Sequence, residues 1–321
     1  MQYPTKINLG RIDFEDRRYC FTLSKAEGRF LHSVKQVGIV QPIMVIERSG
    51  KQVVVSGWRR IEAAKICGLK ELPALEIKEA LSDLEVMKVT FFDNYGQRRF
   101  SIAEKALAVK RLSDFGLSSE EIIARILPLL ELPPERPTLD ILLKLSKLPV
   151  GLEKIHQKDW KLSTVELFLN FPDQEQLWLL RLIENLTHNQ QKEAIELFYC
   201  LKKRKKKSLR ELLEKPGLES YQKAFKNNRL LADDQLLSIL RKEAYPQMFR
   251  LNELIGQTIK QLRLPEKVSL DYDRTLEKTH LKLMAEVRSV FELETYLNQL
   301  VKSFNDENWA KLFDILNNQG Q

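Results

Sequence analysis

A strand-to-helix junction around Gly57 constrains this chain more than any other stretch. Three consecutive valines, residues 53–55, predict a buried strand, and apolar residues follow at helical spacing over 61–66. Glycine allows the backbone to turn tightly between them. The helix that follows offers unpaired amide hydrogens together with the guanidinium groups of Arg59 and Arg60, which suits a phosphate group. The same residues are equally typical of a solvated surface beside an ordinary turn, so neighbouring motifs have to decide.

Two further motifs flank this junction. Upstream, Gly38-Ile39-Val40-Gln41-Pro42 precedes an apolar run over 43–46, which predicts a partner strand for residues 53–55. Downstream, Asp93-Asn94-Tyr95-Gly96-Gln97-Arg98-Arg99 ends an apolar helical stretch. It places a carboxylate beside an amide, the oxygen ligands that Mg²⁺ accepts while it is bound mostly to phosphates. Such a pair is also typical of an ordinary helix end.

The order and spacing of the three motifs resemble the N-terminal domain of the ParB family of plasmid and chromosome partition proteins. The resemblance implies a site for a nucleoside triphosphate, cytidine triphosphate (CTP), with Mg²⁺. The nucleotide-binding residues that it implies are Gly38, Gln41, Pro42, Gly57, Arg59 and Arg60. The metal ligands that it implies are Asp93 and Asn94.

Four departures from the usual family motifs bear on chemistry. Trp58 replaces a glutamate, Glu62 stands where a second arginine often lies, Asp93 shortens a glutamate, and Gly96 is inserted. Each departure counts against full CTP hydrolysis, whereas the retained glycine and arginine pair favour phosphate binding. The sequence leaves open whether the chain is an enzyme, and weak CTP hydrolysis is the activity that the resemblance suggests.

The predicted fold class is α+β. Short strand-like and helical runs alternate over the first 80 residues, and helical signals dominate from residue 82 onward. A length of 321 residues suits two or three domains. The predicted divisions are a ParB-like α/β nucleotide-binding domain, a helical DNA-binding domain with a helix-turn-helix-like segment, a helical linker, and a β-β-α dimerisation module, at residues 1–100, 101–215, 216–265 and 266–321.

The helix-turn-helix-like segment begins at a capping box, Ser101 to Glu104, and a second helix starts at Ser118 or Ser119. Prolines and acidic residues over 128–137 separate it from the next helical run, 138–148. Acidic side chains repel phosphate. The run over 138–148 is therefore either a groove-reading helix or a packing helix whose leucines fill the core.

Six consecutive cations at 202–207 form the strongest electrostatic feature. Such a run predicts salt-sensitive contacts with a phosphate backbone, although a solvated helix end is the alternative. The net charge of +8 also favours an anionic partner. The residues predicted to bind DNA are Arg98, Arg99, Lys144, Lys147, Lys202, Lys203, Arg204, Lys205, Lys206 and Lys207.

The C-terminal part predicts two strands, at 267–273 and 279–287, and an amphipathic helix at 291–304. A unit this small leaves an exposed sheet edge and an apolar helix stripe, which a second copy of the chain can cover. The resemblance likewise implies a homodimer. Docking onto the chain's own helices is the alternative.

Other residue patterns exclude several classes of protein. The three cysteines lack metal-site spacing and predict a reducing compartment, and the four histidines are too scattered for histidine-based catalysis. No apolar run is long enough to span a bilayer. We therefore expect a cytoplasmic, nucleoid-associated protein without a membrane partner.

The function predicted first is a ParB-like DNA-binding protein of plasmid or chromosome partition, switched by CTP with Mg²⁺ and paired with a partition ATPase. An enzyme on the same fold, a small-molecule kinase or a nuclease, is the second hypothesis, with Glu62, Asp93 or Glu104 as general base. A degenerate adaptor is the third, in which Trp58 blocks the nucleotide pocket.

Overall fold

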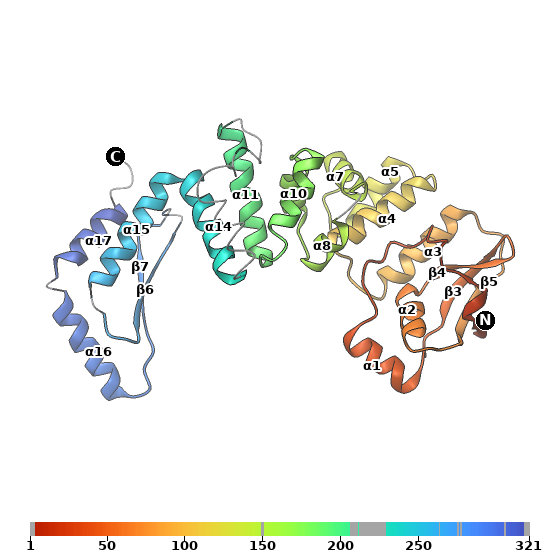
Figure 1. Cartoon of the computed structure of the whole chain (residues 1–321), viewed down its shortest axis with the longest axis horizontal. Coiled ribbons are helices and arrows are strands. Elements are labelled where there is room, and N and C mark those ends of the chain that lie inside the picture. The colour runs from red at the N-terminus through yellow and green to blue at the C-terminus, as the bar shows by residue number, and fades with distance from the viewer. Residues whose placement is uncertain are drawn as a thin grey trace. The chain divides into compact units, whose positions relative to one another are not determined.

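The computed structural model describes residues 4–148, 151–205, 211, 229–262, 264–274, 276, 278–304 and 306–317. They fall into two compact units, Met1–Tyr199 and Cys200–Gln321. Strands and helices occur in both units, so the predicted α+β class is confirmed (Figure 1). Within the described ranges, no helix combines the length and apolarity needed to cross a membrane.

The first unit begins with a five-stranded mixed sheet. Its strands lie in the order β1-β5-β3-β4-β2, with β1 antiparallel to β5, β3 parallel to β5, β3 antiparallel to β4, and β2 parallel to β4. Their bounds are Thr5–Asn8 for β1, Ile12–Asp13 for β2, Ile43–Arg48 for β3, Lys51–Ser56 for β4 and Glu71–Ile77 for β5. A short 3-10 turn, Leu9–Arg11, joins β1 to β2.

The predicted pairing of residues 43–46 with 53–55 is confirmed as the β3–β4 hairpin. Arg48 pairs with Lys51, which leaves a two-residue connection. Both connecting residues have positive φ, 49° at Ser49 and 77° at Gly50. Two successive positive φ values match the right-handed twist of the flanking strands, so this turn sets the register that places Val53, Val54 and Val55 in the core.

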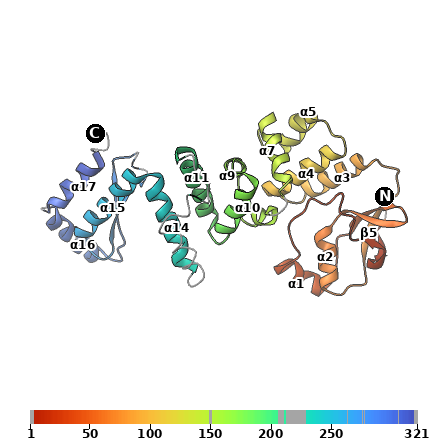
Figure 2. The ribbon, with the colours of Figure 1, turned by 45° about the horizontal axis from the view of Figure 1, so that its top comes forward.

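Two helices, α1 at Gly28–Val37 and α2 at Trp58–Ile66, pack beside each other and against the sheet (Figures 1 and 2). Ala26, Val34 and Ala63 form the small cluster between them. The helix α2 ends where the sequence predicted, because the amide of Gly68 donates to Lys65 O and Gly68 adopts a φ of 69°.

A run of helices completes the first unit. Three of them start with a capping box, at Ser82, Ser101 and Ser118, which confirms the predicted box at Ser101 and selects Ser118 over Ser119. Their bounds are Asp83–Tyr95 for α3, Ile102–Asp114 for α4, Ser119–Glu121 for α5, Leu127–Leu129 for α6, Arg136–Ser146 for α7, Leu152–Gln157 for α8, Leu162–Leu169 for α9, Asp173–Leu182 for α10 and His188–Lys205 for α11.

The helix-turn-helix-like segment differs from the sequence expectation in two respects. A π-helical turn, η2 at Ile122–Ile126, interrupts the helix between α5 and α6. The following helix, α7, starts two residues earlier than expected, because Pro137 fits the first turn of a helix. Leu139, Leu142 and Leu145 of α7 are fully buried, so this face of the helix fills the core.

The second unit contains four helices and a two-stranded antiparallel sheet within the described residues. The bounds are Arg229–Ala244 for α14, Pro246–Gln261 for α15, Val268–Tyr272 for β6, Leu281–Ala285 for β7, Val290–Ser303 for α16 and Glu307–Asn317 for α17. The strands and α16 agree with the predicted β-β-α order. The sequence analysis missed α17, and α15, which it assigned to a linker, contributes Ile255 to a core shared with Leu312 and Leu316 of α17. The four predicted domain divisions stay predictions.

Candidate phosphate-binding site

The start of α2 has the geometry of an anion site. Gly57 is its N-cap residue, with φ 107° and ψ 23°, and no side chain accepts a hydrogen bond from the first turn. A Cβ at this position would lie 2.7 Å from Cγ2 of Ile43, so only glycine fits. The unpaired amides of a nine-residue helix therefore point outward beside two arginines.

Arg60 joins the first and second motifs. Its Nη1 donates to the carbonyl oxygen of Pro42 at 3.0 Å, and its Nη2 donates to Oε1 of Gln41 at 2.9 Å. The same Nη2 also donates to Oε1 of Gln97 at 3.1 Å, which brings in the third motif. These three sequence motifs therefore meet around one guanidinium, as the order of the motifs predicted.

Asp93 and Asn94 lie in the last turn of α3, next to this cluster. Asp93 accepts hydrogen bonds from Ser56 Oγ at 2.5 Å and from Gln97 Nε2 at 2.9 Å. Asn94 donates to Thr90 O at 2.9 Å, which leaves its side-chain oxygen for another partner. One carboxylate and one amide oxygen suit Mg²⁺ when phosphates and water supply the other ligands. The donor set therefore fits the ion that the resemblance implies.

The charge on Arg60 is not neutralised by an ion pair. Burial lowers the pKa of Arg60, and the nearby carboxylate of Asp93 opposes this shift. Within the described residues, no carboxylate lies within 4.0 Å of the nitrogen atoms of Arg59 or Arg60. Guanidinium groups bonded only to neutral acceptors still attract an anion.

Arg59 points to a different place from Arg60. Its Nε donates to the carbonyl oxygen of Lys25 at 3.3 Å, and its guanidinium lies 5.0 Å from the centre of the Phe30 ring. Gly38, also predicted to bind nucleotide, ends α1 with a φ of 73° and donates its amide to Val34 O. The two arginines thus occupy separate surroundings on either side of the first turn of α2.

A cavity of about 500 Å³ lies on the Arg59 side of α2. Of the residues predicted to bind nucleotide, only Arg59 lines it. Trp58 also lines it, with the guanidinium of Arg17 4.7 Å from the ring centre, and packs against the core of the sheet. Cations outnumber carboxylates on the walls, with Arg17, Lys25, Arg59, Lys65 and Arg111 facing Glu15, Glu62 and Glu153.

Sequence reasoning missed several residues of this region. Ser56 and Gln97 bind Asp93, and Gln97 bridges it to Arg60. Gln97 belongs to the third motif, so its position already signalled a role. Arg17 and Lys25 lie in a stretch without strand or helix pattern, and the fold alone brings them to the cavity.

The carboxylates considered as general bases are occupied by structural contacts. Glu62 accepts a hydrogen bond from the amide of Ala26 at 2.7 Å. Glu104 is 1% exposed and accepts from Arg98 Nη1 at 2.7 Å. Among the described residues there is no group of three histidine, cysteine or acidic side chains placed to hold a metal ion.

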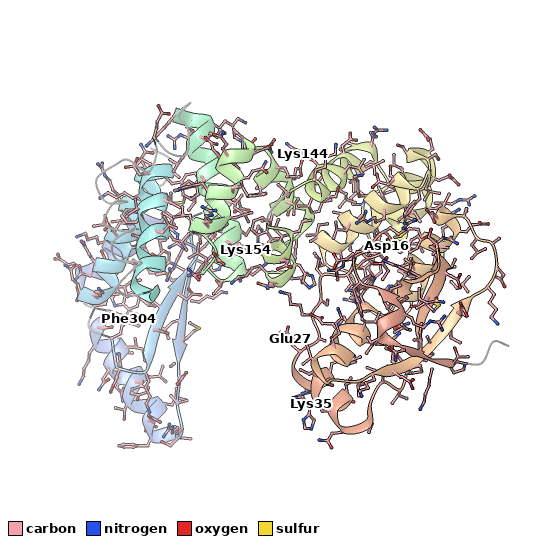
Figure 3. The ribbon with its side chains drawn as sticks, turned by 45° about the vertical axis from the view of Figure 1, so that its right-hand side comes forward. Asp16, Glu27, Lys35, Lys144, Lys154 and Phe304 are labelled. Atoms are coloured by element: carbon pink, nitrogen blue, oxygen red, sulfur yellow. The ribbon has the colours of Figure 1, made fainter. Side chains whose placement is uncertain are left out.

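The predicted DNA contacts in the first unit divide into exposed and engaged side chains. Arg98 is half-buried in its ion pair with Glu104, whereas Arg99 is exposed. On α7, Lys144 donates to the carbonyl oxygen of Leu169, and Lys147 is exposed just beyond the helix (Figure 3 labels Lys144). Arg99 and Lys147 are thus the better placed of these four residues.

The basic run at the end of α11 is partly used inside the second unit. Arg204 donates to the carbonyl oxygen of Ala244, and Lys205 forms an ion pair with Glu243. Lys203 is exposed, and Lys202 is half-buried with an interaction of its own. Lys206 and Lys207 lie outside the described residues. The run is therefore not six equivalent solvated cations.

Comparison with known proteins identifies the region that carries these motifs. Residues 11–95 match the model of the ParB N-terminal domain family. The chain is 33% identical over 113 residues to the chromosome-partitioning protein Spo0J of Thermus thermophilus, covering 32% of this chain and 41% of that protein. It is 30% identical over 150 residues to a probable chromosome-partitioning protein ParB of Neisseria meningitidis, covering 46% of this chain and 50% of that protein.

A solved structure is also similar. It is the C-terminally truncated chromosome-partitioning protein ParB of Caulobacter crescentus complexed to the centromeric parS site, at 19% identity and a TM-score of 0.32, with coverage of 59% of this chain and 96% of that chain. The chain spans half or less of the length of the two curated relatives above.

Proposed function

We propose that this chain, which carries a ParB N-terminal domain, is a DNA-binding protein of the partition type whose sheet domain binds CTP with Mg²⁺. The observation that carries the proposal is the uncapped start of α2 at Gly57, where three separate motifs meet at Arg60. The named relatives are chromosome-partitioning proteins, which supports the same role for this chain.

Phosphate binding is supported by charge and geometry together. The amides of the first turn of α2 lack side-chain acceptors, and Arg60 is bonded only to neutral oxygens. A phosphate oxygen at this point would gain charge-assisted hydrogen bonds without breaking an ion pair. Asp93 and Asn94 would hold Mg²⁺ on the same side, and the ion would neutralise phosphate charge and orient the phosphates.

The cavity beside Arg59 supports binding of a molecule larger than phosphate. Its volume of about 500 Å³ falls in the usual range of small-molecule sites. Arg59 sits at the junction, because it follows Gly57 in the first turn of α2 and also lines the cavity. We assign the phosphates to the helix start and the remainder of the nucleotide to the cavity. Trp58 leaves this volume open, which disfavours the blocked-pocket adaptor.

DNA binding is supported by the net charge of +8 and by exposed cations at Arg99, Lys147 and Lys203. The exposed first turn of α7 has a different character, because Arg136 is paired with Asp140 at 3.0 Å. An i,i+4 pair of this kind offers little net positive charge to a phosphate backbone. Backbone contacts therefore account for affinity more readily than base contacts by α7.

A homodimer is supported by the second unit. Leu300 of α16 is buried, while the opposite face of the helix and the neighbouring strand β7 expose large apolar side chains. Phe291 is 78% exposed and Val301 is 62% exposed. The other exposed apolar residues of this face are Val290, Leu293, Leu297, Phe304, Leu283 and Met284. A second copy would remove this surface from water, and such contiguous patches usually mark an interface. A partition ATPase partner and a nucleoid location stay predictions.

An enzyme on the same fold is disfavoured because Glu62 and Glu104 both accept structural hydrogen bonds. Titration of DNA with the full chain across salt concentrations, with and without CTP and Mg²⁺, tests the proposal. We expect a steep salt dependence and an affinity or dissociation rate that changes with CTP. Binding that ignores CTP, or transfer of labelled phosphate to a small hydroxyl compound, would contradict it.

A further inference from the structure

An irregular segment, residues 22–27, crosses from the sheet to the helices of the first unit. It contains neither strand nor helix and leads into α1 at Gly28, next to the labelled Glu27 (Figure 3). Two of its backbone amides donate to side-chain carboxylates: Leu23 N to Glu104 Oε1 at 3.0 Å, and Ala26 N to Glu62 Oε2 at 2.7 Å. Side chains from other elements therefore take the place of a strand partner.

Glu104 is the centre of the contacts on the helical side. Besides the amide of Leu23, its carboxylate accepts from Arg98 Nη1 at 2.7 Å and from the amide of Ser101 at 3.2 Å. Ser24 Oγ donates to it at 3.5 Å. Burial alone would raise the pKa of Glu104, but the hydrogen bond and charge of Arg98 outweigh it and hold that pKa below its usual value. The side chain is therefore a buried anion with four donors.

The contacts continue into α8. His156 Nδ1 lies 2.7 Å from Ser101 Oγ, and its Nε2 lies 3.4 Å from Ser24 Oγ. Lys25 forms an ion pair with Glu153, at 3.6 Å between Nζ and Oε2. The segment 22–27 is thus fastened to α4 through Glu104 and to α8 through His156 and Glu153.

The same segment forms a wall of the cavity beside α2. Leu23, Ser24 and Lys25 line this cavity together with Arg59. They also line a second hollow of about 450 Å³ with Arg59 and His156. Arg59 donates to the carbonyl oxygen of Lys25, so the cation at the phosphate end of the site is bonded directly to the segment.

We propose that residues 22–27 form a strap over the cavity beside Arg59, which Glu104 fastens to the helices and which closes further over a bound nucleotide. The proposal rests on the proposed function, because it names how that same site is regulated. A phosphate that engages Arg59 competes with Lys25 O for this guanidinium. Occupancy of the cavity therefore reaches α4 and α8 through the strap, and the helices that carry DNA contacts respond to the nucleotide.

Amide hydrogen exchange of the full chain, read in peptides that cover residues 22–27, tests the fastening. Glu104→Gln keeps the shape of the side chain but removes the charge on which its hydrogen bonds depend, so exchange in the strap should rise about tenfold without ligand. Glu121→Gln is the matched control, because Glu121 closes the same kind of capping box at Ser118 and lies outside the strap contacts. Equal strap exchange in the two variants would overturn the proposal.

A second variant covers the case in which Glu104→Gln fails to fold. Ser24→Ala leaves the capping box of α4 intact and removes the hydroxyl that lies between Glu104 and His156. A rise of about threefold in strap exchange is expected, since one neutral hydrogen bond is lost. No rise in this variant would also overturn the fastening.

Closure over a ligand is tested with CTP and Mg²⁺ on the wild-type chain. Exchange in residues 22–27 should slow at saturating CTP, with binding established in parallel by calorimetry. Unchanged or faster exchange in the CTP-bound protein would overturn closure while leaving the proposed function standing. Absence of CTP binding would overturn the proposed function and the nucleotide-driven closure, and the ligand-free comparison of variants would still decide whether Glu104 fastens the strap.

Discussion

Replacement of Gly57 by alanine tests the geometry on which the phosphate site depends. The new Cβ would lie 2.7 Å from Cγ2 and 3.1 Å from Cβ of Ile43, a side chain that is fully buried. A φ of 107° adds backbone strain of about 1–2 kcal/mol for a residue with a Cβ. Overpacking a core typically costs about 1–3 kcal/mol. Gly57→Ala should therefore lower the free energy of unfolding of the sheet by about 2–5 kcal/mol.

Native-state hydrogen exchange of amides in β4 measures this loss locally, which matters because the chain has two units. Gly68→Ala is the matched control: Gly68 also has a positive φ, 69°, but a Cβ there would meet no atom within 4 Å. We expect it to lose only the strain of about 1–2 kcal/mol. Equal losses in the two variants would refute the claim that Ile43 excludes every residue except glycine at the start of α2.

Three further predictions concern other parts of the chain. Burial and the hydrogen bond to Asp83 raise the pKa of Tyr19 from 10.0 to about 12. Its contribution to stability is therefore fully present below pH 10 and lost as the pH rises through 12, and Tyr19→Phe should abolish this dependence in alkaline unfolding curves. Leu297→Glu, on the exposed face of α16, should convert a dimer into a monomer in light scattering, and an undiminished dimer would argue against that face as the interface. Lys203→Ala should reduce the slope of log affinity for DNA against log salt by about 0.9, whereas Arg204→Ala should leave the slope unchanged because Arg204 is bonded within its own unit.

Local patterns predicted much of the fold because the forces behind them are local. The hairpin followed from two apolar runs around Ser49-Gly50, and the start of α4 followed from the capping box at Ser101. The missed helix α17 has a buried stripe of Trp309, Leu312 and Leu316, and that spacing was present in the sequence. The π-helical turn at 122–126 was not readable, because its residues have ordinary helical spacing.

The candidate site was predictable only where motif order carried the information. The three motifs indicated that Gln41, Arg60 and Asp93 would lie together, and the hydrogen bonds around Arg60 support this. The directions of side chains were not predictable, since Arg59 turns to Lys25 while Arg60 turns to Pro42. Residues 14–25 reach the cavity only through tertiary contacts, so no periodicity could have marked them.

Electrostatic patterns were the least reliable guide to availability. The run over 202–207 reads as one basic stretch, yet Arg204 and Lys205 are bonded to the end of α14. Arg98 looked like a DNA contact beside the third motif and instead balances the buried charge of Glu104. Charge along a sequence shows how many cations exist, and the fold determines which of them face solvent.

The most direct test of the central claim is calorimetric titration of the full chain with CTP in the presence of Mg²⁺, comparing wild type, Arg60→Ala and Arg29→Ala. Arg29 is a matched control because it is an exposed cation in the first turn of α1. We predict binding by wild type and by Arg29→Ala, and a loss of at least about tenfold in affinity for Arg60→Ala, the effect of one charge-assisted phosphate contact. Equal affinity of the three proteins, or no heat with any of them, would contradict a phosphate site at the start of α2.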